Sequence, residues 1–506
     1  MELSLAIDRL VLIGSLLLLG SLLTAALAAK AGSRLRVPGA LLFLAIGMAA
    51  GNDGLGLILL DDPSLVRDLG VVALLVILFE GGLTTKPTDL RLAARAGGLL
   101  ATVGVVVTAA ITALGSWALL GIDPAVAMLV GAVVASTDAA AVFSVMRTTA
   151  LPRRVAALLR LESGANDPVA VMLTVGALAI YEGTAAGAGD WARFALVQLV
   201  GGMLVGATLG LLGVVLLRRV ELGLEGLYPV VAAALAGIAY GTAAALGASG
   251  FVAVYVAGLF IGGLVPRHRR SVLGFHEAMA NAAEVGLFLL LGLLVSPSDL
   301  PGVALPALAV SLVLILVARP AAVGLCSLGS GLGWREQAVV VWGGLRGAVP
   351  IVLATFAFTA GTDLGAQVFD VVFFVVLVSV IVQGLTLQPL IRRLGLGSDA
   401  PAWAPVAEAL PLDGIDVDLV ELHVTEDLAI ANKRVHELQG LDTTLVAAVV
   451  RGNRVLIPKG QTRVLPGDVL LMTAQREGDV LSRLTAWARG ESSDGGRPPP
   501  TGPRAG

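Results

Sequence analysis

A short polar segment stands at the head of an apolar run in this 506-residue chain. Glu162 and Asn166 are four residues apart and would share one stripe of a helix, and Ser163 and Asp167 would share the neighbouring stripe. The apolar run 169–180 follows directly. An ionised side chain at the centre of a bilayer costs at least ~2.5–3.5 kcal/mol, so a carboxylate inside a span indicates a functional site and needs a partner.

Charged residues inside three other apolar runs are the candidate partners. Asp138, Arg319 and Arg346 each lie well inside such a run, so two aspartates and Glu162 face two arginines. Pro168 has no backbone N–H, and it leaves one carbonyl of its helix free to act as a ligand. We therefore expect one polar cluster assembled from several helices.

Two of these runs have sequences typical of interrupted helices. Ser136 and Thr137 stand beside Asp138 in the fifth predicted span, and the glycine-rich stretch 343–347 lies in the twelfth. Exposed carbonyls of interrupted helices coordinate cations, and the half-helix ends supply partial charge. If the seventh span links two halves of six spans, the fifth and twelfth are equivalent, which predicts inverted repeats with a site at the midplane.

The composition indicates an all-α polytopic membrane protein. Hydrophobic residues make up 57% and charged residues 14%, and the mean hydropathy is +0.90, whereas a soluble domain is about 25% charged. We predict about 13 transmembrane helices: 9–29, 37–51, 67–85, 96–120, 124–146, 153–180, 192–217, 227–247, 250–265, 275–296, 303–328, 335–361 and 367–391. The membrane domain thus spans 1–397.

Loop charges set the expected orientation. Lysine and arginine concentrate in alternate loops, which predicts an N-terminus outside and a C-terminal domain in the cytoplasm, as in the cytoplasmic (inner) membrane of a prokaryote. Scattered arginines and a net charge of −3 give no nucleic-acid signature. The single cysteine, Cys326, excludes a disulfide framework or a cysteine metal cluster.

The last hundred residues have ordinary polarity. We predict a linker over 398–414, a small cytoplasmic α/β domain over 415–489 and a disordered tail over 490–506.

The two aspartates suggest a mechanism. Asp138 and Asp167 repel each other unless a proton or a metal cation neutralises them, and a desolvated carboxyl beside another is easily protonated. Aspartate, hydroxyl and carbonyl oxygens suit a hard monovalent ion. Proton and cation would then compete for the same oxygens, and only the loaded forms would cross the membrane readily. This is exchange, and the protein would be a secondary transporter rather than an enzyme.

At these residues the sequence resembles the NhaP branch of the cation/proton antiporters, in the form seen in potassium/proton antiporters. The matching motifs are Phe79-Glu80-Gly81-Gly82-Leu83, Ser136-Thr137-Asp138, Glu162 to Pro168, Gly250 to Gly258, Arg319 and Gly344 to Ala348. The resemblance implies an NhaA/NhaP-like antiporter fold with spans five and twelve broken, and a homodimer.

The resemblance also implies roles for individual residues. Asp167 would bind the ion and the proton, and Asp138, Ser163 and the carbonyl of Thr137 would be further ligands of a monovalent cation. Glu80 would reach the ion through water.

Four other residues would form a structural charge network. Glu162 would pair with Arg319, and Arg346 would steady the crossed helices. Asn166, where some relatives have a second aspartate, is associated in the family with electroneutral one-for-one exchange.

Residues 415–475 resemble the C-terminal half of potassium-conductance regulator domains, the RCK_C or TrkA-C type. This favours K⁺ over Na⁺ and suggests control by an unknown small cytoplasmic ligand. No Gly-x-Gly-x-x-Gly motif follows a strand, so NAD is unsupported and we expect no cofactor.

Three alternatives stay open at this point. A Na⁺/H⁺ antiporter fits the same oxygen ligands. A cation channel lacks a recognisable carbonyl selectivity filter. An intramembrane serine protease would use Ser249 with His268 or His276, but the predicted topology places the serine on the opposite side of the membrane from both histidines.

Overall fold

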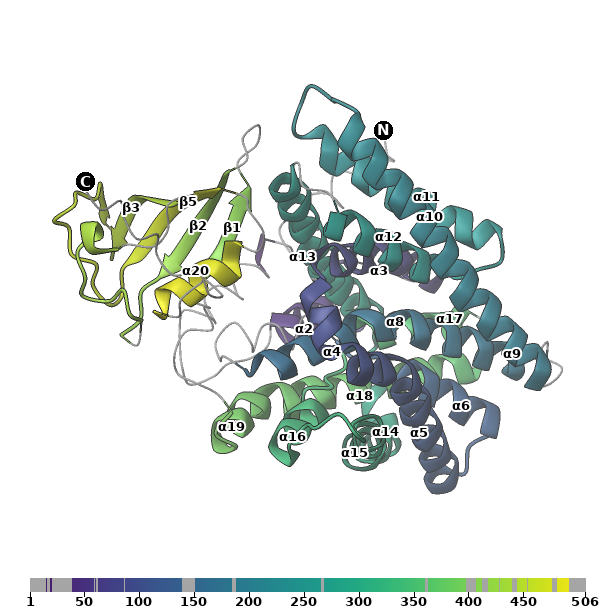
Figure 1. The fold of residues 1–506 in the computed structure, drawn as a ribbon. Helices are drawn as coiled ribbons and strands as arrows, with labels where there is room; N and C mark the ends of the chain where they lie inside the picture. The colour runs from purple at the N-terminus through teal and green to yellow at the C-terminus, as the bar shows by residue number, and fades with distance from the viewer. Residues whose placement is uncertain are drawn as a thin grey trace, which may run out of the picture. The chain divides into compact units, whose positions relative to one another are not determined.

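The computed structural model describes most of the chain, and Figure 1 shows its fold. The described residues are 15, 19–20, 39–58, 60, 62–85, 87–138, 151–183, 188–264, 268–359, 363–396, 406–411, 417–426, 428–438, 444–452, 454–475 and 480–490. Nearly all of the predicted first span and of the predicted disordered tail lies outside these residues. The chain divides into two compact units, 1–265 with 271–399 and 266–270 with 400–506.

The first unit is built from helices. They are α2 (Gly39–Ala50), α3 (Pro63–Thr84), α4 (Pro87–Leu99), α5 (Val105–Leu120), α6 (Pro124–Val133), α8 (Arg153–Tyr181), α9 (Ala188–Leu196), α10 (Gly202–Arg219), α11 (Leu227–Ala245), α12 (Gly250–Leu264), α13 (Arg269–Leu294), α14 (Leu300–Val313), α15 (Arg319–Cys326), α16 (Trp334–Trp342), α17 (Ala348–Thr359), α18 (Asp363–Ser379) and α19 (Leu385–Arg393). Each predicted span from the second to the thirteenth contains helix in the described residues.

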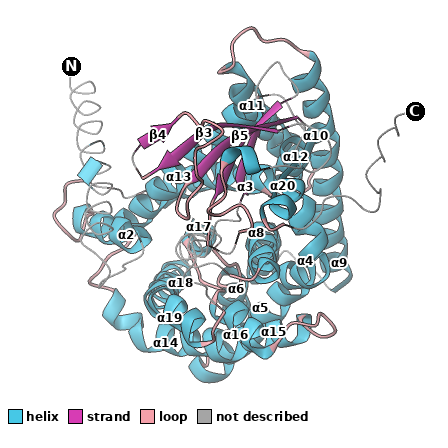
Figure 2. Ribbon diagram, turned by 60° about the vertical axis from the view of Figure 1, so that its left-hand side comes forward, coloured by secondary structure: helices cyan, strands magenta, loops and turns pink. Residues whose placement is uncertain are grey.

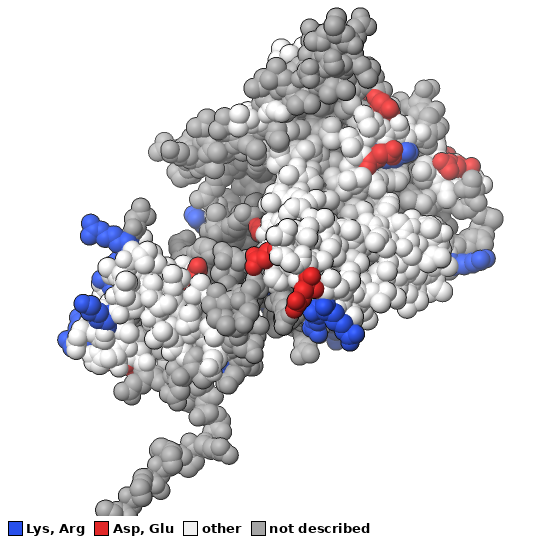
Figure 3. Space-filling model, turned by 90° about the horizontal axis from the view of Figure 1, so that it is seen from above, with Lys and Arg blue, Asp and Glu red and all other residues white. Residues whose placement is uncertain are grey.

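Length and hydropathy support a membrane-spanning protein. Among the described residues, 7 helices are long and apolar enough to cross a bilayer, and α2, α6, α12 and α17 are shorter apolar helices. Large apolar side chains such as Leu204, Leu305 and Leu316 are exposed on the helices, and Figure 3 shows broad areas of the helical unit without charged side chains. Such surfaces are stable against lipid. The predicted all-α polytopic fold is confirmed.

Local sequence explains where several helices begin. The Asp62 carboxylate accepts hydrogen bonds from the N–H groups of Ser64 and Leu65 ahead of α3. The Asp123 carboxylate does the same for Ala125 ahead of α6. In both helices a proline follows the capping aspartate, and its fixed φ suits the first helical position.

π-Helical turns join α4 to α5, α9 to α10, α14 to α15 and α18 to α19. They cover Leu100–Gly104, Val197–Gly201, Leu314–Ala318 and Val380–Gly384. The sequence analysis did not predict them. Extra-residue turns of this kind often occur at functional positions because they re-aim the side chains that follow, and Arg319 comes directly after the third.

Close packing between α3 and α12 depends on glycine. A Cβ at Gly258 would lie 2.6 Å from the carbonyl oxygen of Phe79, and a Cβ at Gly262 would overlap the backbone of Leu83. No larger residue fits at this separation without moving one of the helices. The motif 250–258 therefore contributes to the backbone contact that fixes α3.

The second unit contains a five-stranded antiparallel sheet in the order β1-β2-β5-β3-β4. Its elements are β1 (Val406–Pro411), β2 (Val417–His423), a 3₁₀ turn (Val435–Glu437), β3 (Thr444–Arg451), β4 (Arg454–Leu456), β5 (Val469–Gln475) and α20 (Val480–Ala488). Figure 2 shows that strands occur in this unit alone among the described residues. Leu422, Leu470 and Met472 form its core with Leu484 of α20.

One predicted boundary is corrected here. Residues 406–411 lie within the predicted linker 398–414, but they form β1 and pair antiparallel with β2. Without β1 the backbone groups along one side of β2 would be an open sheet edge, and an added strand removes that edge. The linker prediction rested on its proline and alanine content, which does not reveal strand pairing.

An ion pair between the partly exposed Arg451 and the buried Asp468 joins two parts of the sheet domain. Both oxygens of Asp468 accept hydrogen bonds from Arg451, each at 2.8 Å, and the N–H of Leu465 donates to the same carboxylate. Burial by itself would raise the pKa of Asp468, but the bonds from Arg451 and Leu465 outweigh it and hold the pKa below its usual value of 3.8. Folding therefore favours the ionised carboxylate.

We expect Asp468→Asn to destabilise the sheet domain at neutral pH by about 1 kcal/mol, since the Arg451 side of the pair is partly solvent-exposed. The stabilisation from a lowered carboxyl pKa is fully present above the unfolded value and disappears as pH falls through the folded value. Amide hydrogen exchange of β5 in the full-length protein should show the difference at pH 7 and a smaller one below pH 3.8. Equal protection of parent and variant at pH 7 would contradict this expectation.

Candidate functional site

The backbone of span twelve is interrupted inside the membrane unit. α16 ends at Trp342, residues 343–347 are not helical, and α17 begins at Ala348. In span five, α6 ends at Val133 and residues 136–138 are not helical. The second half of span five lies outside the described residues. The prediction of a broken helix is confirmed for span twelve, where helix is described on both sides of residues 343–347, and it stays a prediction for span five.

The two non-helical segments meet through backbone and side chain. The N–H of Asp138 donates to the carbonyl of Leu345 at 2.8 Å. The Arg346 guanidinium donates to the carbonyls of Ala135 and Ser136 at 3.1 and 2.7 Å, and this side chain is 1% exposed. Arg346 therefore places a positive charge at the C-terminal end of α6, where the carbonyls carry partial negative charge.

Asp138 occupies the opposite kind of helix end. Its carboxylate lies against Gly347, where a Cβ would overlap it, directly before the N-terminus of α17. The free N–H groups of a helix N-terminus carry partial positive charge and favour an anion. The crossing thus pairs the C-terminal end of α6 and the N-terminal end of α17 each with a side chain of opposite charge.

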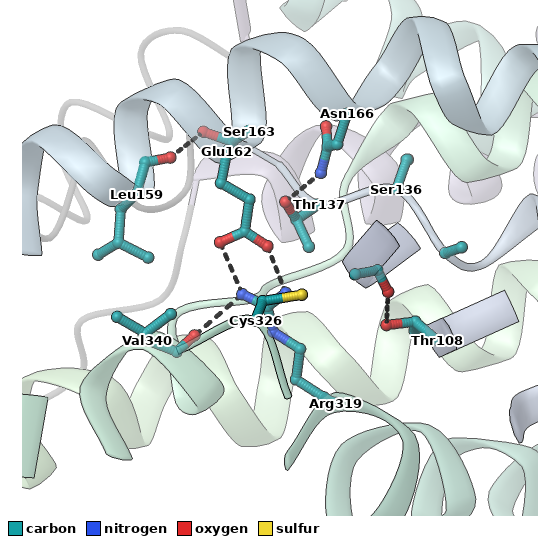
Figure 4. A network of polar contacts seen from close by, with 12 residues as sticks. Thr108, Ser136, Thr137, Leu159, Glu162, Ser163, Asn166, Arg319, Cys326 and Val340 are labelled. Atoms are coloured by element: carbon teal, nitrogen blue, oxygen red, sulfur yellow. Dashed lines mark hydrogen bonds and ion pairs between the residues drawn. The ribbon is translucent and has the colours of Figure 1, made fainter. Parts of the chain in front are cut away.

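A buried ion pair supports the crossing from a third side. Arg319 of α15 binds both carboxylate oxygens of Glu162 on α8, and its Nη2 also donates to the carbonyl of Val340 at 3.0 Å (Figure 4). The side chains are 4% and 2% exposed. A Cβ at Gly344 would overlap the guanidinium, so glycine is needed there. The pair connects α8, α15 and the last turn of α16.

The ligand candidates of α8 are arranged along its buried face. Asn166 donates its side-chain N–H to the hydroxyl of Thr137, and the Ser163 hydroxyl donates to the carbonyl of Leu159 at 2.6 Å (Figure 4). Asp167 is buried, and its carboxylate is near enough to that of Asp138 for the two to repel. We predicted a structural role for Glu162 and Asn166. Their side chains bond to residues of other spans, Glu162 to Arg319 and Asn166 to Thr137.

Several buried oxygens at the crossing accept no hydrogen bond. They are Oδ1 of Asp167, Oδ1 of Asn166 and Oγ of Ser136. Buried polar atoms without partners are rare because each costs desolvation energy. Carboxylate, amide and hydroxyl oxygens are the ligands of a hard cation. The donor set therefore fits a monovalent cation or a proton as the substrate.

Glu80 lies apart from this contact network. It is partly buried on α3, its carbonyl accepts a hydrogen bond from Thr84 in the same helix, and its carboxylate repels that of Glu277 on α13. The contacts that the structure gives Glu80 are thus to α3 and α13. A ligand role through water stays a prediction.

Two functional candidates were missing from the sequence analysis. Ser379 of α18 and Gln383 of the following π-helical turn are buried, and they hydrogen-bond to the backbone of Arg346 and Trp342. The available signal was a serine and a glutamine four residues apart within an apolar span.

The structure gives no support to the serine protease. The Ser249 hydroxyl accepts a hydrogen bond from the N–H of Val252 and caps the start of α12. The His276 ring nitrogen Nδ1 lies 2.7 Å from the carbonyl of Val272, and the ring packs edge-on against Phe79. In the described part of the chain, no group of three or more His, Cys, Asp and Glu side chains could hold a metal ion.

Comparison with known proteins agrees with this geometry. The profile described as "Sodium/hydrogen exchanger, transmembrane" matches residues 19–393, and that of the TrkA-C domain matches residues 419–485. The chain is 39% identical over 490 residues to the K(+)/H(+) antiporter NhaP2 of Shewanella oneidensis, which covers 94% of this chain and 84% of that protein. It is 31% identical over 398 residues to the Na(+)/H(+) antiporter NhaS2 of Synechocystis, covering 76% of this chain and 72% of that one.

A solved structure shares the fold. The sodium proton antiporter MjNhaP1 of Methanocaldococcus jannaschii at pH 8 superposes with a TM-score of 0.66 at 24% identity, over 78% of this chain and 99% of that one. With a family profile that covers most of the membrane unit and relatives that extend through the sheet domain, the chain belongs to the transmembrane sodium/hydrogen exchanger family and carries a C-terminal TrkA-C domain.

Proposed function

We propose that this protein is a secondary antiporter that exchanges a monovalent cation for H⁺ across the cytoplasmic membrane of a prokaryote. One observation carries the proposal: the buried Asp167 and the partly buried Asp138 lie at the crossing of spans five and twelve, beside buried oxygens without hydrogen-bond partners. Asp167 and Asp138 bind cation and proton in turn, with Ser163 and the Thr137 carbonyl as further ligands of the ion and Glu80 reaching it through water.

The charge balance of the crossing supports one-for-one exchange. Glu162, Asp138 and Asp167 contribute three negative charges when ionised, and Arg319 and Arg346 contribute two positive charges, which leaves −1. One monovalent cation or one proton brings this cluster to zero. Both loaded forms are then neutral, whereas the empty form carries a net charge that hydrocarbon disfavours. Exchange is therefore electroneutral, and uncoupled return of the empty carrier is suppressed.

K⁺ is the favoured cation and Na⁺ the alternative. The relative named for K⁺/H⁺ antiport is more similar to this chain than the one named for Na⁺/H⁺ antiport, and its match extends over nearly the whole chain. A TrkA-C domain in the same chain supports a link to potassium. Both ions accept the same oxygen ligands, so the choice depends on the size of the site.

The arrangement in the cell follows from the loop charges. We place the N-terminus outside and the TrkA-C domain in the cytoplasm, where an unknown small ligand regulates exchange. Two copies form a homodimer in the bilayer, as the resemblance implies. The domain limits stay as proposed, 1–397 for exchange and 415–489 for regulation, with the linker shortened by β1.

Asp167→Asn should abolish exchange while the protein stays folded, because the amide neither ionises nor loses a proton near neutral pH. The assay is a cation-driven pH change in sealed proteoliposomes at zero membrane potential, with K⁺, Na⁺, Rb⁺ and Li⁺ compared. Asp370→Asn on α18 is the matched control and should retain exchange. Full activity of Asp167→Asn would sink the assignment, and cation flux without proton flux in the parent would favour a channel.

Breaking the pair of Glu162 and Arg319 should cost about 3–5 kcal/mol for either Glu162→Gln or Arg319→Gln, because each leaves a buried charge unpaired. The double variant should recover part of that loss. Thermal unfolding in detergent compares the stability of the parent, the two single variants and the double variant, which together form a double-mutant cycle. If both single variants are as stable as the parent, the pair is not structural.

Removal of residues 398–506 should change the activation of exchange and leave the cation preference unchanged, because the proposed ligands all lie in the membrane unit. Proteoliposome exchange measured across pH for the parent and the truncated protein separates these quantities. An altered ratio of K⁺ to Na⁺ transport would count against this division of roles.

A further inference from the structure

Ser379 and Gln383 form a buried polar pair that the exchange scheme leaves without a role. They lie one turn apart in span thirteen and are 0% and 2% exposed. The π-helical turn Val380–Gly384 starts directly after the serine and includes the glutamine. Two buried polar side chains in an apolar span need partners, because the bilayer supplies none.

Their partners lie at the two ends of the break in span twelve. Gln383 Nε2 donates to the carbonyl of Trp342 at 3.2 Å, and Gln383 Oε1 accepts from the hydroxyl of Ser379 at 2.6 Å. The same hydroxyl oxygen accepts from the N–H of Arg346 at 3.0 Å. The pair thus bridges the last residue of α16 and the residue two positions before α17.

The bridge continues through one peptide unit to Asp138. The N–H of Arg346 and the carbonyl of Leu345 belong to the same peptide plane, which is trans, so the two groups point in opposite directions. That carbonyl accepts the N–H of Asp138 at 2.8 Å. The plane is therefore held by Ser379 on one side and by Asp138 on the other.

We infer that Ser379 and Gln383 are positioning residues that set the geometry of the ion site through this peptide plane. The inference rests on the proposed exchange function. The hydrogen bonds from the Asp138 N–H to the Trp342 carbonyl form a chain in which each group accepts from the group before it and donates to the group after it. In such a chain, each bond is strengthened by polarisation from its neighbours. Loss of a link would release Asp138, and with it the carbonyls that Arg346 holds.

Glutamine fits this position because its amide both donates and accepts. Methionine has a similar length and neither donates a hydrogen bond nor accepts a strong one. An ionised glutamate accepts but cannot donate to Trp342, whereas a protonated glutamate can do both. These three side chains of similar size therefore separate the hydrogen-bond pattern from the volume.

The first test measures the half-saturating K⁺ and Na⁺ concentrations for exchange in proteoliposomes of the full chain. Ser379→Ala and Gln383→Met should raise them by about 10-fold or more, as expected when an outer partner of a cation ligand is lost. Ser311→Ala is the matched control, since the Ser311 hydroxyl is equally buried and bonds only within its own helix. It should leave these concentrations unchanged.

A purely structural role would lower the maximal rate and the melting temperature and leave the half-saturating concentrations at the parent value, and this result would overturn the inference. Absence of exchange in the parent protein would instead overturn the proposed function. Cation-dependent rises in melting temperature give a second readout without transport. The midpoints of these rises should shift in the same direction and by a similar factor.

Gln383→Glu adds a test with nearly unchanged volume. The quantity to measure is the ratio of the half-saturating cation concentration of the variant to that of the parent at the same pH. This ratio should be about 1 at acidic pH, where the protonated acid replaces the amide, and about 10 or more at alkaline pH, where the ionised acid cannot donate. A ratio that stays constant across pH would contradict the bridging role.

Discussion

Backbone groups at an interrupted helix inside a bilayer must find partners within the protein, and the membrane unit is organised around this constraint. The crossing of spans five and twelve exposes carbonyls of Ala135, Ser136 and Val340 that no helix can satisfy. Guanidinium groups of Arg346 and Arg319 satisfy them. Each arginine brings a positive charge into a site with low dielectric. The arginines that bond the free carbonyls therefore need negatively charged groups nearby.

The three carboxylates at the crossing differ in how their negative charge is compensated. Glu162 forms a bidentate pair with Arg319, and both side chains are almost fully buried. Asp138 lies at the N-terminus of α17, where the helix end favours an anion. Asp167 keeps a carboxylate oxygen without a hydrogen-bond partner. When all are ionised, Glu162, Asp138 and Asp167 exceed Arg319 and Arg346 by one negative charge, which a cation or a proton balances in the proposed exchange scheme.

Two glycines allow charged side chains to contact the backbone at the break in span twelve. Glycine at positions 344 and 347 lets Arg319 and Asp138 approach the backbone of span twelve, because a Cβ at either position would overlap those side chains. The peptide plane between Leu345 and Arg346 then transmits the position of one span to the other. A shift of this plane would move Asp138, which is an ion ligand in the proposed exchange scheme, and the hydrogen bond from Arg346 to Ser379 restrains the plane on its other side.

The sequence alone identified the membrane class, most spans, the broken helix of span twelve and the polar residues at the crossing, because charge and glycine inside apolar runs are conspicuous. It also indicated the sheet domain. It did not reveal the π-helical turns or β1, since extra residues in a helix and strand pairing leave little trace in local composition.

Tertiary structure decided which polar groups meet. Glu162, Asp138, Arg319 and Arg346 lie on four different spans. Residue spacing within one helix cannot predict that side chains of different helices lie close together. The bridge through Ser379 and Gln383 was invisible for the same reason: its partners are backbone groups of Trp342 and Arg346. The sequence lists the side chains. The backbone groups that lack a partner in a helix, and that those side chains bond, can be identified only in the folded structure.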